Sequence, residues 1–298
     1  MTAKIIDGKA IAKNICDHLK NKVQDLLRNN CPAPGLAVIL VGNDPASQVY
    51  VRNKRAACQN CGIKSIALDL PQHISEERLL SHIEQLNQDP SVHGILLQLP
   101  LPQSIHTPLV LESIDFTKDV DGFHPLNLGL LAQGRPYLRP CTPYGIIRLL
   151  EYEKIALRGL DAVIVGKSNI VGKPMALELL NAGCTVTLCH STTRDIEKYV
   201  KQADLLIAAT GKAGIIKSQW IKSNSIVIDV GVVRMSNGKL HGDIEFETAK
   251  QLAGYITPVP GGVGPMTIAM LLENTLIAAT STRKITYRKI LNQPAPEK

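Results

Sequence analysis

The chain has 298 residues and a formal net charge of +7. Because a single hydrophobic core rarely grows beyond roughly 250 to 300 residues, this length favours two domains that share a cleft. With 45% hydrophobic and 20% charged residues, the composition excludes disorder as the dominant state. The positive charge favours anionic ligands, such as a dinucleotide phosphate or a polyglutamate tail. It forms no stripe with interleaved aromatic residues, so we expect no nucleic-acid partner.

The lack of a recognisable targeting signal and the cysteine usage lead us to expect a cytoplasmic protein. The longest apolar runs, 92–101 and 160–165, are strand-sized and fall short of the ~20 residues that cross a bilayer, so no membrane association is expected. The N-terminal segment lacks the apolar stretch of a secretory signal. Seven cysteines at irregular spacings are typical of reduced thiols. We expect the Cys58-x-x-Cys61 pair to be structural, and we expect no metal site.

Strand and helix patterns alternate along the first half of the chain. Apolar residues at helical spacing predict an amphipathic helix over 11–26, with Asp7 as its N-cap. The patterns then predict strands at 36–41, 65–70 and 92–97, and helices at 46–61 and 75–87. Such alternation is typical of a mostly parallel sheet with both faces covered.

The second half repeats this alternation. Predicted strands lie at 160–165, 185–189, 204–208 and 226–230, with helices between them. Thr142 followed by proline predicts an N-cap and a helix that runs to about residue 152 and links the two halves. We expect Asp195 to cap a later helix, a helix over 266–279 to return to the first domain, and residues 293–298 to form a mobile tail.

These patterns predict an α/β protein with two α/β domains flanking a cleft, the second of them Rossmann-like. The first domain is predicted at 1–141 and is completed by a C-terminal helix at about 273–298. The second domain is predicted at 142–272.

A glycine-containing turn follows the first strand of the second domain. The segment 166–174 lies between a strand and a helix, where glycine lets the backbone approach a pyrophosphate and the helix N-terminus attracts negative charge. Its spacing differs from G-x-G-x-x-G, so the strand-turn-helix context carries the prediction. The next strand ends at Cys189-His190-Ser191 without an acidic residue to repel a 2′-phosphate. Since Lys167 and Ser191 could hold that phosphate, NADP is favoured over NAD.

A candidate catalytic group lies on the predicted helix 46–61. Ser47, Tyr50 and Lys54 share one face of that helix because of their spacing. A lysine beside an aromatic residue in a cleft can be desolvated and can exchange protons near neutral pH. The alternative is that Lys54 is one of several surface bases, together with Arg52 and Arg55.

Three other segments have the features of site loops. Gln98 ends a buried strand and is followed by two prolines, at the edge where open α/β sheets bind ligands. Segment 118–123 places two carboxylates near a glycine, where they could cap, form pairs or accept hydrogen bonds from an amino-heterocycle. Segment 258–265 is too rich in proline and glycine for regular helix or central strand, and predicts a shaped loop before a helix.

Together these segments resemble, over nearly the full chain, the methylenetetrahydrofolate dehydrogenase/cyclohydrolase family. The resemblance rests on motifs that occur in the family's order. They are Ser47-x-x-Tyr50-Val51-x-x-Lys54, Gln98-Leu-Pro-Leu-Pro102, Lys118-Asp-Val-Asp-Gly-Phe123, Pro140-Cys-Thr-Pro143, Gly166-x-Ser-x-x-Val-Gly-x-Pro174, Cys189-His-Ser191 and Thr257-Pro-Val-Pro-Gly-Gly-Val-Gly-Pro-Met-Thr267.

The resemblance implies a homodimer that binds tetrahydrofolate derivatives on the first domain and NADP on the second. It implies that Lys54 is the acid/base of the cyclohydrolase step, that Gln98 is hydrogen-bonded to it, and that Tyr50 stacks on the folate. Asp121 would bind the pterin amino groups. The remaining implied contacts are Ser47, Pro260, Gly261 and Gly262 for the substrate, and Gly166, Lys167, Ser168, Ser191, Val232 and Thr142 for NADP.

The implied activity has two steps. The first oxidises 5,10-methylenetetrahydrofolate to the methenyl form with NADP, and the second hydrolyses that product to 10-formyltetrahydrofolate. The chain departs from the family at Lys167, where arginine is usual, so a weaker preference for NADP is expected. Two alternatives stay open: a two-domain dehydrogenase of an amino or hydroxy acid, and a non-catalytic dinucleotide-binding protein. The first has no need of Tyr50, Lys54 and Gln98 together, and the second would lose the lysine.

Overall fold

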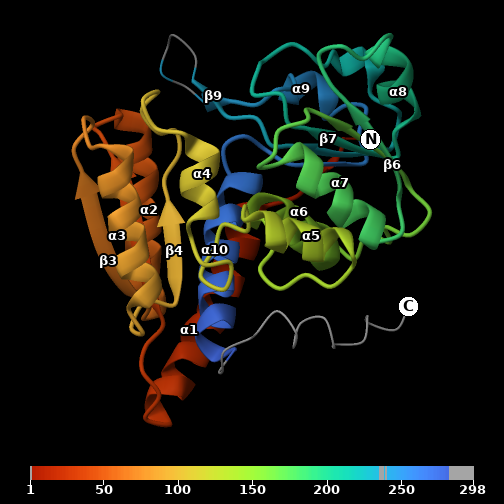
Figure 1. The fold of residues 1–298 in the computed structure, drawn as a ribbon. Coiled ribbons are helices and arrows are strands. Elements are labelled where there is room, and N and C mark those ends of the chain that lie inside the picture. The colour runs from red at the N-terminus through yellow and green to blue at the C-terminus, as the bar shows by residue number, and fades with distance from the viewer. Residues whose placement is uncertain (1, 235–237, 239, 282–298) are drawn as a thin grey trace. The chain divides into compact units, whose positions relative to one another are not determined.

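The computed structural model describes residues 2–234, 238 and 240–281 (Figure 1). By its contacts the chain divides into two compact units. Unit 1 comprises residues 1–13 and 142–269, and unit 2 comprises residues 14–141 and 270–298. Each unit contains a parallel β-sheet with helices, so the predicted α/β class is confirmed.

Unit 2 is built on a three-stranded parallel sheet in the order β3-β2-β4. The central strand is buried at every residue, because it is paired on both edges and covered on both faces. The strands are β2 (Gly35–Val41), β3 (Lys64–Leu70) and β4 (Gly94–Leu97), and the helices of this region are α2 (Pro45–Cys61), α3 (Glu76–Gln88), α4 (Thr107–Glu112) and α5 (Pro125–Ala132).

Helix α2 carries the candidate catalytic residues and is capped at both ends. The Asp44 carboxylate accepts a hydrogen bond from the backbone N–H of Ser47 at 2.7 Å, which satisfies a donor in the first turn. At the other end, Gly62 takes the left-handed conformation with φ 76°, which terminates the helix. These caps fix where α2 begins and ends, and therefore which of its side chains lie over the sheet.

Unit 1 contains a six-stranded sheet in the order β1-β11-β8-β7-β5-β6, parallel throughout. A short antiparallel pair, β9 (Val233–Arg234) with β10 (Leu240–His241), lies outside this sheet. The strands of the large sheet are β1 (Lys4–Ile5), β5 (Asp161–Val165), β6 (Thr185–Cys189), β7 (Leu205–Ala208), β8 (Ile226–Asp229) and β11 (Tyr255–Ile256), and the helices are α6 (Cys141–Tyr152), α7 (Gly172–Asn181), α8 (Ile196–Gln202), α9 (Phe246–Ala249) and the 3₁₀ helix η1 (Ser218–Trp220).

The chain passes from one unit to the other within α1 (Gly8–Arg28), after the first residue of α6, and within α10 (Val263–Thr280). Asp7 caps α1 as predicted, since its carboxylate accepts a hydrogen bond from Ala10 N at 3.0 Å. Among the described residues, α10 is the one helix long and apolar enough to cross a membrane by length and composition, and 50% of it is buried within the structure. A buried core helix has the same length and composition.

The predicted strands and helices occur within a few residues of their expected positions. One difference concerns Thr142, which is not an N-cap because α6 already begins at Cys141. The thiol of Cys141 is buried and donates to Val120 O at 3.1 Å, so packing anchors the first turn two residues earlier than the cap signal indicated.

Two further predictions about helix ends hold only in part. Asp195 occupies the N-cap position of α8, but it has φ 50° and its side chain makes no capping hydrogen bond. The loop predicted at 258–265 ends earlier, because Val263 already starts α10. Pro265 is tolerated there, since a proline in the first helical turn removes no hydrogen bond within the helix. The predicted tail at 293–298 lies outside the described residues.

Candidate active site and dinucleotide site

Lys54 and Gln98 are brought together in unit 2. Lys54 is half-buried on α2 and donates from Nζ to Gln98 Oε1 at 3.1 Å. The other end of the same amide is held too, since Gln98 Nε2 donates to Leu99 O at 2.7 Å. This second hydrogen bond fixes which end of the amide faces the lysine. The ammonium or amine group of Lys54 is therefore held at the carboxyl end of β4.

Asp121 and Asp119 come from one short motif but have different surroundings. Asp119 is buried, and its carboxylate accepts hydrogen bonds from His124 N at 2.8 Å and Asn127 Nδ2 at 2.9 Å. Asp121 is half-buried. Burial raises its pKa to about 6, while the nearby positive charge of Lys54 opposes the rise. Asp119 therefore stabilises the fold, whereas Asp121 is the carboxyl group whose pKa, raised by burial, is lowered in part by the positive charge of Lys54.

The segment that carries Asp121 is supported by a buried asparagine. Asn274 of α10 donates from Nδ2 to Val120 O and to Arg139 O, each at 2.8 Å. The backbone N–H of Cys141 donates to Asp121 O at 3.3 Å. The segment that contains Val120 and Asp121 is thereby held beside the segment that contains Arg139 and Cys141. Sequence reasoning missed Asn274, because a residue so distant in the chain has no local pattern that links it to the motif.

Tyr50 and Ser47 lie on α2, one and two turns before Lys54. The side chain of Tyr50 is 44% exposed, whereas Ser47 is only 4% exposed. Tyr50 therefore presents an aromatic surface that a flat ligand could stack on. Ser47 lies in the capped first turn of the helix.

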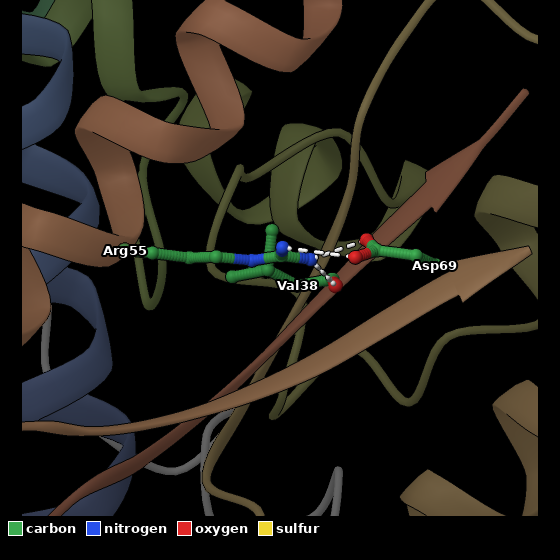
Figure 2. Close-up of polar contacts among 3 residues, drawn as sticks. All are labelled: Val38, Arg55 and Asp69. Carbon is green, nitrogen blue, oxygen red and sulfur yellow. Dashed lines mark hydrogen bonds and ion pairs between the residues drawn. The ribbon is translucent and has the colours of Figure 1, made fainter. Parts of the chain in front are cut away.

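Arg55 attaches the same helix to β2 and β3, through the contacts that Figure 2 shows. Its guanidinium group donates to the two carboxylate oxygens of Asp69 on β3, at 2.6 and 3.1 Å, and to Val38 O of β2 at 3.4 Å. A two-pronged arginine–carboxylate pair also fixes orientation. Helix α2 is thus attached to β3 through Arg55 and to the residue after β4 through Lys54.

The predicted dinucleotide turn of unit 1 depends on close backbone packing. Gly166 has φ +127°, and a Cβ added there would lie 2.0 Å from Ala209 O. A Cβ on Gly172 would lie 1.8 Å from Gly166 O. The Ser168 hydroxyl accepts hydrogen bonds from the N–H groups of Val171 and Gly172, at 3.1 and 3.3 Å. Only glycine allows this approach at both positions, and the turn leads directly into α7.

The other predicted cofactor residues also lie in unit 1. Lys167, Ser168 and Ser191 are exposed at the ends of β5 and β6, and Val232 follows β8 with 46% of its surface exposed. Thr142 is half-buried in the first turn of α6, and its hydroxyl is hydrogen-bonded to that of Thr267 at 2.9 Å.

The predicted substrate loop at Pro260, Gly261 and Gly262 contacts the start of α1. The carbonyl of Gly261 accepts a hydrogen bond from Lys9 N at 2.9 Å. The loop therefore has a fixed attachment within unit 1.

Sequence models of one family match both parts of the chain. The catalytic domain of tetrahydrofolate dehydrogenase/cyclohydrolase matches residues 6–121, and its NAD(P)-binding domain matches residues 140–283. The chain belongs to the tetrahydrofolate dehydrogenase/cyclohydrolase family.

Individual relatives agree with this membership. The bifunctional protein FolD of Methylobacillus flagellatus is 56% identical over 278 residues, covering 93% of this chain and 96% of the relative. The FolD structure from Campylobacter jejuni has 52% identity and a TM-score of 0.92, covering 94% of this chain and 99% of that one. The Trypanosoma brucei FolD structure, a complex with NADP cofactor and an inhibitor, has 38% identity and a TM-score of 0.91, covering 95% and 99%.

The predicted activities are thereby confirmed. The chain is a dehydrogenase and cyclohydrolase that converts 5,10-methylenetetrahydrofolate to 10-formyltetrahydrofolate through the methenyl form, with NADP as the oxidant. A shikimate dehydrogenase from Aquifex aeolicus has a TM-score of 0.51 at 14% identity. This likeness concerns the fold alone, so it does not support the alternative of a different two-domain dehydrogenase.

Proposed function

We propose that Lys54 is the acid/base of the cyclohydrolase step in this member of the family, and that Gln98 holds it in place. The observation that carries the proposal is the 3.1 Å hydrogen bond between Lys54 Nζ and Gln98 Oε1. The lysine is half-buried on a capped helix, and its partner is fixed by a bond of its own. A proton-transferring group needs such restraint because its geometry must suit the transition state.

Hydrolysis of the methenyl cation requires two proton transfers that one lysine could make in turn. The oxygen of water bonds to the methenyl carbon while the neutral amine of Lys54 takes a proton from that water. The bond between this carbon and N5 of the folate then breaks, the hydroxyl proton is lost as the formyl group forms, and N5 receives a proton from the lysine. One proton is released overall, so the charge of the cation is balanced.

The preceding oxidation depends on alignment more than on acid–base chemistry. NADP supplies the acceptor for a hydride from the methylene carbon. For this step we propose that Tyr50 stacks on the folate ring system and that Asp121 accepts hydrogen bonds from the pterin amino groups. Ser47 and the loop residues Pro260, Gly261 and Gly262 would complete the folate contacts.

For the dinucleotide we propose contacts along the C-terminal edge of the large sheet of unit 1. The backbone of Gly166 and Ser168 would lie against the pyrophosphate, and Lys167 and Ser191 would hold the 2′-phosphate. Val232 would contact the nicotinamide side, and Thr142 would complete the set. The positions of the glycines and the exposure of Lys167 and Ser191 support this assignment.

The decisive experiment is the variant Lys54→Met, which keeps the length of the side chain and removes its proton chemistry. The rate of methenyltetrahydrofolate hydrolysis should fall by about a hundredfold or more. Oxidation with NADP should persist, because it needs no proton transfer from Lys54, and the methenyl product should accumulate. The measurement is a spectrophotometric assay that follows reduced cofactor and methenyl product separately.

Arg52→Met is the matched control. It removes an exposed positive charge from the same helix without touching the Lys54–Gln98 pair. Both activities should stay near wild type. A Lys54→Met protein that hydrolyses the methenyl substrate at the wild-type rate would contradict the assigned role.

We propose, finally, a cytoplasmic homodimer in which unit 2 binds folate and unit 1 binds NADP. Compared with the predicted domains, 1–141 completed by a helix from about residue 273 and 142–272, residues 1–13 join the NADP-binding unit, because β1 pairs with β11. Residues 282–298 of that completion lie outside the described part of the chain. The family resemblance supports the dimer, and light scattering on the purified protein would test it by giving twice the 32.4 kDa mass of one chain.

A further inference from the structure

Two buried carboxyl groups lie near the C-terminal end of β8 in the large sheet of unit 1, and neither belongs to a site predicted from the sequence. Asp229 is the last residue of β8, and Asp243 follows β10. Their exposed fractions are 4% and 0%. Burying a carboxyl group costs free energy unless its oxygens accept hydrogen bonds. We therefore expect the hydrogen bonds of these two groups to stabilise the surrounding backbone.

Asp229 organises the chain that follows its own strand. Its Oδ1 accepts hydrogen bonds from Gly231 N at 2.9 Å and from Asp243 N at 3.0 Å, and its Oδ2 accepts one from Ile244 N at 2.9 Å. Because both oxygens are acceptors, an amide could not replace the carboxylate without turning a donor toward a backbone N–H. Asp229 thus fixes the segment that leads to Val232.

Asp243 extends the same network to the next loop. Its Oδ2 accepts hydrogen bonds from Thr210 N at 2.5 Å and from Gly211 N at 3.1 Å, just after β7. Its Oδ1 has no hydrogen-bond partner among the described residues. The loops after β7 and β8 are therefore joined through two side chains, with Asp229 holding the backbone of Asp243.

The loop held by Asp243 packs directly on the dinucleotide turn. A Cβ on Gly166 would lie 2.0 Å from Ala209 O, so the backbone beside Thr210 is in contact with that turn. In the sheet, β5 lies between β6 and β7. If the adenosine phosphate is held at the end of β6 and the pyrophosphate at the turn after β5, the remainder of the dinucleotide extends over β7 and β8.

We propose that Asp229 and Asp243 are positioning residues of the dehydrogenase step, which hold the loops after β7 and β8 in the conformation that receives the nicotinamide half of NADP. This proposal rests on the dinucleotide site proposed above. Neither carboxylate contacts the reacting atoms; each acts through the backbone of Thr210, Gly211 and Gly231. Hydride transfer is sensitive to small misplacements of donor and acceptor, so the loops' positions should affect the rate as well as binding.

The test compares Asp229→Asn with Asp243→Asn and Asp243→Ala. Asp229→Asn places an amide donor where backbone N–H groups point, and should lower kcat of the dehydrogenase and raise KM for the dinucleotide, each by about tenfold. Asp243→Ala should have a similar effect. In Asp243→Asn the amide oxygen can take the place of Oδ2, which accepts both hydrogen bonds, and the amide nitrogen can take the place of Oδ1. The kcat and KM of this variant should therefore stay within about threefold of wild type.

Two internal readouts separate this role from a general loss of structure. Hydrolysis of methenyltetrahydrofolate without NADP should be unchanged in all three variants. The loss in Asp229→Asn should be equal with NADP and NAD, because the network does not face the 2′-phosphate. An equal fall of both activities, or wild-type dehydrogenase kinetics in Asp229→Asn, would overturn the proposal. Gly166→Ala tests the dinucleotide site separately from the roles of Asp229 and Asp243. Normal binding of NADP by that variant would show that the dinucleotide site itself is misassigned.

Discussion

The Lys54 site of unit 2 is made of side chains, whereas the dinucleotide turn of unit 1 is made of backbone. In unit 2 a lysine and a glutamine are hydrogen-bonded to each other beside a half-buried carboxyl group. In unit 1 the predicted ligands Lys167, Ser168 and Ser191 are exposed, and the close contacts are those of Gly166 and Gly172. Proton transfer needs a titratable group in a fixed place, while a pyrophosphate is bound well by amide N–H groups.

Both regions also contain a carboxyl group whose pKa burial raises to about 6, Asp121 in unit 2 and Asp229 in unit 1. Asp229 accepts hydrogen bonds from backbone N–H groups, but the side chain of Asp121 has Lys54 as its main charged neighbour. A carboxyl group whose oxygens all accept backbone hydrogen bonds supports loops, and one whose main charged neighbour is a side chain can still bind a ligand. This contrast leads to four predictions, in order of decreasing effect.

Gly166→Ala should break the backbone-made site and leave the side-chain site intact. The added methyl group would collide with Ala209 O, and φ +127° is strained for alanine. We expect the kcat/KM of the dehydrogenase for NADP to fall by more than about a hundredfold, with unchanged hydrolysis of methenyltetrahydrofolate. Gly129→Ala, where the methyl group meets no atom within 4 Å, is the control. Normal NADP kinetics in Gly166→Ala would show that the turn does not bind the dinucleotide.

Folate binding should weaken as the pH falls through the pKa of Asp121. Below a pKa of about 6 the carboxyl group is protonated and no longer attracts amino groups as an anion. One unit below its pKa only about a tenth stays ionised, so the dissociation constant for methenyltetrahydrofolate should rise about tenfold between about pH 7 and about pH 5. Calorimetric titration measures it. Asp121→Asn should bind weakly at both pH values, and a flat profile in the wild type would argue against this carboxyl group as a folate ligand.

Lys167→Ala should affect the choice of coenzyme. Since Lys167 is exposed, solvent screening limits its contribution, and we expect KM to rise by about fivefold for NADP and to change little for NAD. Lys173→Ala is the matched control, because that exposed lysine of the same turn is already bonded to Asn169 at 2.8 Å. Equal changes for the two coenzymes would place the 2′-phosphate contact elsewhere.

Asp69→Asn should produce the smallest effect, and it tests whether the anchoring of α2 matters to Lys54. The Arg55–Asp69 pair is partly exposed, with side-chain exposures of 24% and 59%, so its loss should lower the cyclohydrolase rate by only about two- to threefold. The dehydrogenase should change less. Asp25→Asn, which breaks the exposed pair with Arg28, serves as the control. A loss of equal size in both activities would indicate general destabilisation instead.

The sequence by itself determined the α/β class, most strands and helices, the helix face that carries Lys54, and the turn at Gly166. These features depend on local patterns: apolar periodicity, caps, and glycines between a strand and a helix. The motifs also determined the family, since their order is a property of the chain alone.

Only the tertiary structure decided which side chains meet. The Arg55–Asp69 pair and the support from Asn274 join residues that no local pattern connects. The Lys54–Gln98 bond was expected from the family resemblance, but its geometry comes from the fold, which brings the end of β4 beside α2. The roles of Asp119 and Asp121 also diverged only through their surroundings. Asp229 and Asp243 had no sequence signal, because an acidic residue at a strand end is usually exposed. Their function as acceptors appears only when the loops after β7 and β8 fold over them, since burial then makes every unpaired backbone N–H costly.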